Sequence, residues 1–139
     1  MSAIRFFSEK VRFELPHPRK TSNWLKKTIQ KEGFRLKSLN IIFCSDAYLG
    51  KMNQRYLNHK TLTDIITFDN SDDQALIEGD IFISIPRIRE NAKKFKVSSE
   101  SELHRVMVHG VLHLMGYSDK SARQKSIMRK KEDAYLSLR

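Results

Sequence analysis

The hydrophobic residues of this chain form two kinds of pattern, and the first kind predicts strands. Apolar and polar residues alternate between Ile4 and Leu15, which is typical of one or two short strands. Runs at residues 36–44, 63–69 and 79–85 predict three more strands, and 36–44 becomes wholly apolar toward its end. We therefore expect a small sheet with the strand 36–44 near its centre.

The second pattern has helical spacing and lies between residues that begin or end helices. Thr21 or Ser22 can cap the first helix, and Gly33 ends it. The predicted inner faces are Trp24, Leu25, Thr28 and Ile29 in the first helix and Tyr48, Leu49, Met52 and Tyr56 in the second. The expected helices are residues 22–32, 46–57, 86–95, Ser98 or Ser99 to Gly116, and 121–137.

Strands and helices are mixed along the chain, without a repeat or a linker. This order predicts an α+β fold: a single domain over residues 1–139, with a small mixed sheet packed by about five helices. Hydrophobic residues make up 40% of the chain, but no apolar run approaches the ~20 residues that cross a membrane. The N-terminus lacks the apolar block of a secretory signal, so we expect a cytoplasmic protein without a membrane partner. The single cysteine, Cys44, excludes an intramolecular disulfide and a zinc site of cysteines alone.

The charge balance indicates an anionic partner. Lys and Arg number 26 against 16 Asp and Glu, a net charge of +10. Nucleic acid is the first interpretation and an acidic membrane surface the second. A basic surface that only keeps the protein soluble is the alternative. The lack of a strongly basic amphipathic helix at the N-terminus argues against the membrane.

The segment HGVLHLMGYSD at residues 109–119 places two histidines in an almost wholly apolar helix. His109 and His113 are one turn apart, so they share a face and could bind one metal ion together. Gly116 allows the chain to reverse, and Asp119 beyond it could supply a third ligand. The alternative is a pair of core histidines with hydrogen-bonded ring nitrogens. His104 lies off this face, and we interpret it as a packing residue.

A zinc peptidase is disfavoured, although two histidines at this spacing are also found in its HExxH motif. The glutamate that would act as general base is replaced by Gly110. Glu102 lies on nearly the same helical face as His109, but two turns, or about 10 Å, away. The small Gly110 instead lets another element or a substrate backbone approach closely.

The histidine segment resembles the signature HGxLHLxGYDH of the YbeY family, bacterial endoribonucleases of rRNA maturation. MNQRYLNHKTLTDIITF at residues 52–68, GDIFIS at 79–84 and ELHRVMVHG at 102–110 also resemble family motifs. The resemblance implies one α+β domain and one divalent metal, Zn²⁺, held by three side chains of the signature. It further implies single-strand-specific RNA cleavage in small-subunit (16S) rRNA 3′ end maturation and ribosome quality control. The implied partners are rRNA, the small ribosomal subunit and ribosome-associated proteins.

Carried onto this chain, the resemblance assigns His109, His113 and Asp119 as the metal ligands. Most relatives have a histidine at the position of Asp119 and an aspartate at that of Ser118. A site of two histidines and one carboxylate suits zinc and some other divalent ions. The presence of a metal is therefore predicted more firmly than its identity.

A second departure concerns a cation. The family block usually carries an arginine implicated in activity, and Leu57 stands at its position here. Arg55, His59 or Lys60 could supply the positive charge that stabilises a phosphate. Equally, they are ordinary solvated residues at a helix end.

Two motif aspartates, Asp64 and Asp80, could orient a ligand histidine through its second nitrogen. We favour the alternative, in which both hold turns at strand starts.

The expected reaction is hydrolysis of RNA by a metal-bound water. The sequence does not identify the general base. Basic residues of the helix 86–95 and of residues 51–60 would hold the phosphate backbone. The alternative function is a non-catalytic ribosome-assembly or RNA-binding factor with a structural metal, which Leu57 favours.

Overall fold

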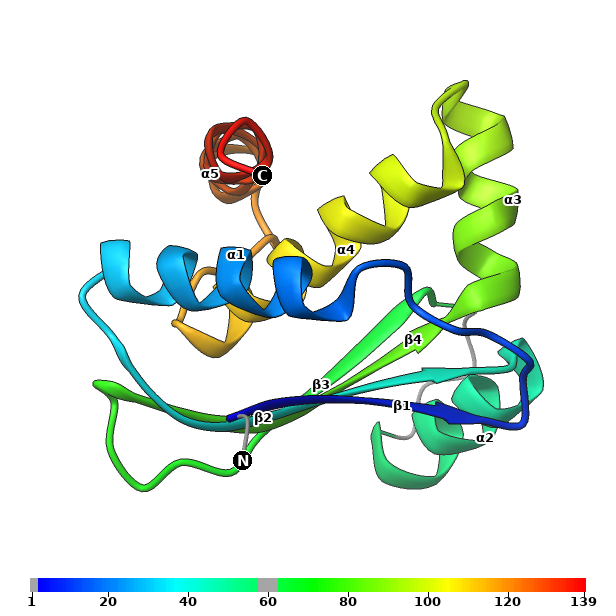
Figure 1. Ribbon diagram of the computed structural model, residues 1–139, viewed down its shortest axis with the longest axis horizontal. Helices are drawn as coiled ribbons and strands as arrows, with labels where there is room; N and C mark the ends of the chain where they lie inside the picture. Colours follow the sequence, from blue (N-terminus) through cyan, green and yellow to red (C-terminus); the bar gives the residue numbers. More distant parts are fainter. Residues whose placement is uncertain (1–2, 58–62) are drawn as a thin grey trace.

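The computed structural model describes residues 3–57 and 63–139 (Figure 1). Its strands are β1 Ile4–Glu9, β2 Arg35–Cys44, β3 Ile65–Asp69 and β4 Leu76–Ser84. Its helices are α1 Pro18–Lys31, α2 Asp46–Leu57, α3 Ile85–Phe95, α4 Ser99–Leu114 and α5 Ala122–Leu136. The α+β class and the set of five helices agree with the prediction for the described part of the chain.

The strands form one mixed sheet in the order β1-β2-β4-β3. β1 and β2 run parallel, as do β2 and β4, whereas β3 lies at the edge and runs antiparallel to β4. The central position predicted for the strand 36–44 is confirmed, since β2 pairs on both sides. β4 begins at Leu76, earlier than predicted.

The alternation between Ile4 and Leu15 produces only one strand, β1. Because β1 pairs parallel with β2, the chain must return to the other end of the sheet, and α1 makes that crossover. Val11, Phe13 and Leu15 belong to an irregular segment and pack against the core from there. Their alternation therefore reflects alternate burial of a loop at the edge of the core.

Helix α1 begins at Pro18, and Thr21 and Ser22 are buried inside it instead of capping it. Proline suits the first helical position because its missing N–H is not needed there. The predicted inner face is confirmed: Trp24, Leu25, Thr28 and Ile29 are all buried.

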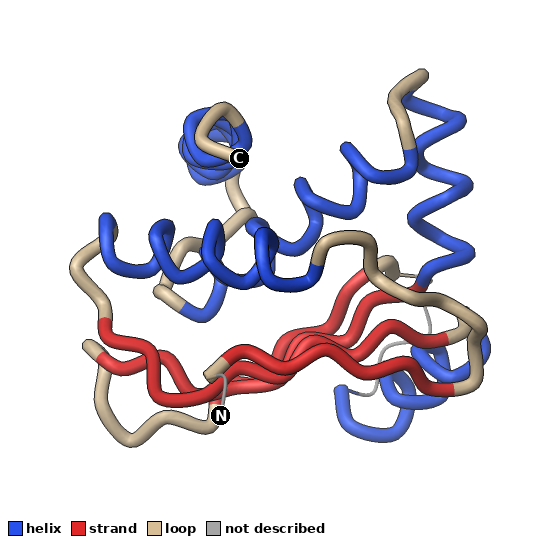
Figure 2. Tube along the Cα trace, in the orientation of Figure 1, coloured by secondary structure: helices blue, strands red, loops and turns tan. Residues whose placement is uncertain are grey.

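Helix α2 lies on one face of the sheet, and α1, α4 and α5 lie on the other (Figure 2). The Ser45 side chain caps α2 by accepting a hydrogen bond from the Tyr48 N–H at 3.1 Å. Leu49 is buried with Cys44, and Tyr48 and Met52 pack against them. Tyr56, predicted on the inner face, is 59% exposed because it lies at the rim of this cluster, against the ring of Phe68.

Helix α4 crosses the sheet and buries the apolar residues of its middle turns, among them Met107, Val108 and Val111. A Cβ on Gly110 would lie 2.8 Å from Ile65 Cδ1 and 3.0 Å from Ile81 Cδ1, so this glycine allows the helix to touch β3 and β4. The close approach predicted for Gly110 is thus made by the sheet, and it fixes the neighbouring His109 beside the start of β3. None of the described helices is both long and apolar enough to traverse a bilayer.

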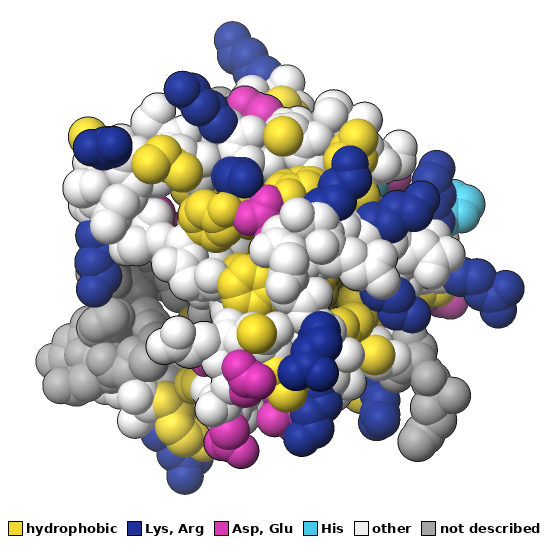
Figure 3. Space-filling model, turned by 90° about the vertical axis from the view of Figure 1, so that its left-hand side faces the viewer, with side chains coloured by type: hydrophobic (Ala, Val, Ile, Leu, Met, Phe, Trp, Pro, Cys, Tyr) yellow, Lys and Arg dark blue, Asp and Glu magenta, His cyan; other side chains and the backbone are white. Residues whose placement is uncertain are grey.

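The basic excess is visible on the surface. Lys and Arg side chains predominate over Asp and Glu on the face shown in Figure 3. On α3, Arg89, Lys93, Lys94 and Lys96 are exposed as predicted, whereas Arg87 is partly buried and forms a salt bridge with Asp46 at 2.8 Å.

Candidate metal centre

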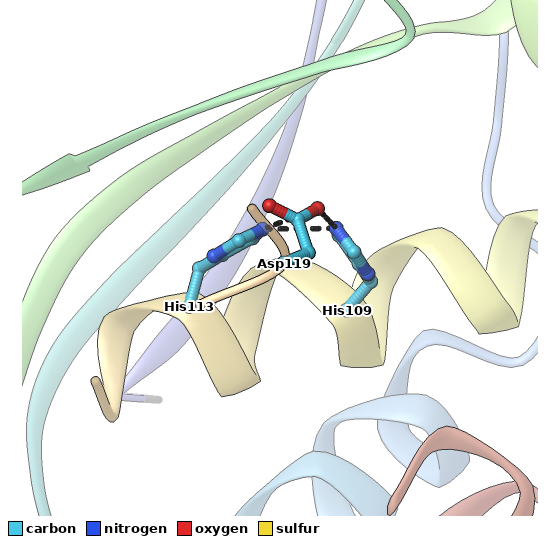
Figure 4. Close-up of side chains that lie close together, drawn as sticks. All are labelled: His109, His113 and Asp119. Carbon is cyan, nitrogen blue, oxygen red and sulfur yellow. Dashed lines mark hydrogen bonds and ion pairs between the residues drawn. The ribbon is translucent and has the colours of Figure 1, made fainter. Parts of the chain in front are cut away.

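The three ligands predicted from the sequence come together at the end of α4 (Figure 4). The Nε2 atoms of His109 and His113 are 2.9 Å apart. Asp119 Oδ2 lies 3.3 Å from the first of these nitrogens and 3.4 Å from the second. All three side chains are partly exposed, so an ion or substrate can reach the nitrogens from solvent.

The turn after α4 brings Asp119 back toward the histidines. Gly116 adopts φ 97°, a conformation that glycine tolerates and that reverses the chain direction. The Gly116 N–H donates to the His113 carbonyl at 3.0 Å, and the Tyr117 N–H donates to the Leu112 carbonyl at 3.1 Å. These bonds end the helix and direct the following residues back along the side of the helix that carries the two histidines.

Both imidazoles are held with Nε2 facing the site. His113 Nδ1 is 2.9 Å from the Tyr117 carbonyl oxygen, which can only accept, so this nitrogen carries the proton. His109 Nδ1 is 2.6 Å from Glu132 Oε2 and donates to that carboxylate. When both rings are neutral, two lone pairs and the Asp119 carboxylate therefore face one another.

This arrangement of acceptors fits a divalent cation. Three acceptors without a donor between them repel, and a cation or a shared proton removes the repulsion. Ligands about 2.0–2.1 Å from a tetrahedral zinc lie about 3.3 Å from each other. The two distances from Asp119 match that spacing, and the distance between the nitrogens is slightly shorter.

Glu132 contacts the candidate site, and it was not predicted from the sequence. It is 5% exposed, and it accepts hydrogen bonds from His109 and, at 2.9 Å, from Arg105 Nη1. Burial lowers the pKa of His109, but the Glu132 hydrogen bond and charge, with Asp119 and Asp64, raise it overall. The detectable signal was the spacing of Met128, Glu132 and Tyr135, which places an acid within the buried stripe of α5.

A second hydrogen-bond network fixes the loop that carries Tyr117 and Asp119 to the rest of the fold. The Tyr117 hydroxyl donates to Glu32 Oε1 at 2.5 Å, and Lys131 and Tyr135 of α5 both donate to Glu32 Oε2. Burial acts to raise the pKa of Glu32, but these hydrogen bonds together lower the pKa overall. The carbonyl that orients His113 belongs to Tyr117, so Glu32 holds that carbonyl in place.

A cleft of about 370 Å³ opens beside His109 and Asp119. The basic residues on its walls are Arg105, Lys125 and Arg129, and the further carboxyl groups are Asp64, Glu102 and Glu132. Arg105 is neutralised by Glu132 and Asp133, whereas Lys125 and Arg129 are exposed. The cleft thus combines two of the three acceptor residues, His109 and Asp119, with two cations available to a phosphate.

Arg55, the one basic helper within the described residues, does not line this cleft. Arg55 is exposed on α2, where its guanidinium lies 5.5 Å from the Tyr56 ring centre. His59 and Lys60 lie outside the described residues, as does the side chain of Leu57.

Neither motif aspartate orients a ligand histidine. Asp80 accepts hydrogen bonds from Asn40 at 3.0 Å and Asn70 at 3.3 Å, as expected for a structural residue. Asp64 lines the cleft, accepts from Asn91 at 3.5 Å, and has a pKa raised by burial. His104 packs its ring 5.5 Å from that of Trp24, away from the ligands, as interpreted from the sequence.

Glu102 is 6% exposed, and its carboxyl group makes no hydrogen bond or salt bridge with another described residue. Burial raises its pKa, and the charge of Asp64 raises it further. An acid whose pKa is higher in the folded state destabilises the fold above that pKa. We expect Glu102→Gln to raise the free energy of unfolding at pH 7 by roughly 0.5–2 kcal/mol. The gain should disappear as the pH falls below ~4.3, the unfolded-state value.

Denaturant titrations at both pH values measure this effect. Glu100→Gln, at an exposed position in the first turn of the same helix, is the matched control and should bring no gain. A loss of stability in Glu102→Gln at neutral pH would contradict the cost assigned to the buried charge.

Comparison with known proteins places these features in one family. The sequence model of Endoribonuclease YbeY matches residues 5–138. The chain is 50% identical to Endoribonuclease YbeY of Cytophaga hutchinsonii over 136 residues, covering 98% of this chain and 95% of that protein. It is 47% identical to Endoribonuclease YbeY of Amoebophilus asiaticus over 133 residues, covering 96% and 90%. The solution structure of a Thermotoga maritima protein is similar with a TM-score of 0.66 at 26% identity, covering 96% and 87%.

Proposed function

This chain belongs to the endoribonuclease YbeY family, and we propose that it is a metal-dependent endoribonuclease that cleaves single-stranded RNA. His109, His113 and Asp119 would hold one divalent ion, which we propose to be Zn²⁺. The observation that supports this most directly is the convergence of two oriented Nε2 atoms and a carboxylate at the open end of a buried helix.

When bound, the ion supplies Lewis acidity toward a phosphoryl oxygen and lowers the pKa of a water molecule. Lys125 and Arg129 would bind phosphates on either side of the scissile bond, because both are exposed on the cleft wall. Among the carboxyl groups of the cleft, we assign proton transfer to Asp64. Its raised pKa keeps a proton available at higher pH than an ordinary aspartate would.

The natural substrate that we propose is the 3′ region of small-subunit rRNA, in maturation and ribosome quality control in the cytoplasm. The family membership supports this choice. The described cleft has no exposed aromatic residue on which a base could stack, so its contacts favour the backbone over the sequence. Ribosome-associated proteins would then direct the enzyme to its site.

Metal removal tests the proposal. Elemental analysis of the purified protein should find about one zinc per chain. Treatment with a chelator should reduce cleavage of single-stranded RNA to background and leave RNA affinity and circular dichroism unchanged, and added Zn²⁺ should restore cleavage. The structural reason is that hydrogen bonds to Glu132 and Tyr117 hold the histidines without the ion.

The alternative, an assembly factor with a structural metal, is favoured by Leu57 at the position of the family arginine. It predicts a different result in the same experiment. The chelated protein would unfold, and the metal-loaded protein would bind RNA without cutting it.

A further inference from the structure

A second, larger hollow lies on the other side of α4 from the metal centre. Its volume is about 1270 Å³, and most of its lining residues belong to the N-terminal ends of α1 and α4 and the C-terminal end of α5. Figure 1 shows how these three helices are arranged. The side chains that characterise it are His17, Arg19, Lys20, Lys27, His104 and Arg139. We call this region the basic hollow. None of its residues lines the cleft beside His109.

The cations of the basic hollow lack acidic partners. Arg19, Lys20, Lys27 and Arg139 form no salt bridge with any acidic side chain of the described residues, and Glu100 is the one acidic side chain among the described lining residues. Elsewhere in the fold Arg87, Arg105 and Lys131 are all paired with buried or partly buried acids. Cations gathered around a concave surface without counter-charges attract anions.

The protonation of His104 is affected by the positive charges around the basic hollow. Arg139 Nη1 lies 2.7 Å from His104 Nδ1 and donates to it, so this ring is neutral with its proton on Nε2. Burial lowers the pKa of His104 most, and Arg139 lowers it further. Glu100 raises it by less than Arg139 lowers it, and Lys20 adds a smaller lowering effect. The positive charge of the hollow is therefore felt by a titratable group on its wall.

We propose that the basic hollow is a second RNA-binding site, which holds phosphates of the same single strand at a distance from the metal centre. The inference rests on the function proposed above. A single inorganic ion would occupy little of this volume, whereas several spaced cations match the repeated phosphates of a nucleic acid.

Helix α5 connects the two sites. Arg129 lines the cleft and Leu136 lines the hollow, two turns or about 10 Å farther along the helix. At ~3.4 Å of rise per nucleotide, a stacked strand covers this distance in about three nucleotides. One RNA molecule can therefore contact both sites, and a very short one cannot.

Substrate length separates the second site from the first. In the zinc-loaded protein, Arg19→Ala combined with Lys20→Ala should raise KM for an RNA of about 16 nucleotides about tenfold near 0.15 M salt. The salt dependence of log KM should lose about 1.4 units of slope, or ~0.7 for each phosphate contact. The kcat for this RNA should not change, and neither should any constant for an RNA dinucleotide, whose single phosphodiester phosphate cannot contact both sites.

The matched control is Arg5→Ala combined with Arg12→Ala, which removes the same charge from two exposed positions outside both the cleft and the basic hollow. Equal effects of the two double variants would mean that only net charge matters, and would overturn the proposal. So would an equal rise in KM for the short and the long RNA.

A second measurement does not require cleavage. In NMR titrations, single-stranded RNA should raise the pKa of His104, because phosphates offset the charges of Arg139 and Lys20. A pKa of His104 that responds to polyglutamate and not to RNA would overturn the proposal in favour of an acidic protein partner. If the wild type cleaves no RNA but RNA still shifts His104, the proposed activity fails while the binding site stands.

Discussion

Replacing His113 with alanine is expected to abolish stoichiometric zinc binding and to lower RNA cleavage about a thousandfold. The residue supplies one of three converging ligand atoms, and its ring is already oriented by the Tyr117 carbonyl. Without it, one nitrogen and one carboxylate remain, too few for a stable zinc site. Elemental analysis and cleavage of a labelled single-stranded RNA measure the two effects.

Two further variants sharpen this test. Asp119→Ala should also lose the ion, since Asp119 Oδ2 is the third ligand atom. Asp119→His should keep about one zinc per chain, because imidazole is an equally suitable zinc ligand. Full zinc retention in Asp119→Ala would rule out the three-ligand assignment, and so would an Asp119→His protein without metal.

The ligands could be predicted because they are local in sequence. His109 and His113 share a helical face by spacing alone, and a glycine with φ 97° returns Asp119 to them within a few residues. Their orientation could not be predicted in the same way. Glu132 meets His109 across 23 residues, and Glu32 meets Tyr117 across 85. Such contacts depend on how α5 and α1 pack, which no local pattern encodes.

Topology also decides which cations face the cleft. Arg55 belongs to a motif that precedes β3, but α2 packs on the opposite face of the sheet from α4 (Figure 2). Neither Lys125 nor Arg129 was assigned a role from the sequence, and the crossing of α5 places both on the cleft wall. Periodicity reports which residues are buried, and the topology decides which of them meet.

Glu132→Gln is expected to weaken zinc binding by about 10–100-fold near pH 8, the usual effect of losing a carboxylate that holds a ligand histidine. Glutamine can still accept a hydrogen bond from His109 Nδ1, but its neutral amide no longer increases the basicity of the ring. The salt bridge to Arg105 is lost as well, so a control must separate the two effects.

Asp133→Asn provides that control. Asp133 binds the same guanidinium at 2.8 Å, is 58% exposed, and does not touch His109. We expect its zinc affinity to stay within about twofold of the wild type, since exposed ion pairs contribute little. Competition with a zinc indicator measures all three proteins.

The pH dependence of the Glu132→Gln defect follows from the same contact. Glu132 raises the pKa of His109, so protons compete with zinc at higher pH in the wild type than in the variant. At pH values above the His109 pKa of both proteins, protons do not compete with zinc, so only the intrinsic weakening of zinc binding is seen. As the pH falls through the wild-type value, the wild type loses affinity first, and the difference between the proteins should narrow. A defect that stays constant or widens toward acid pH would mean that Glu132 acts on the fold and not through the protonation of His109.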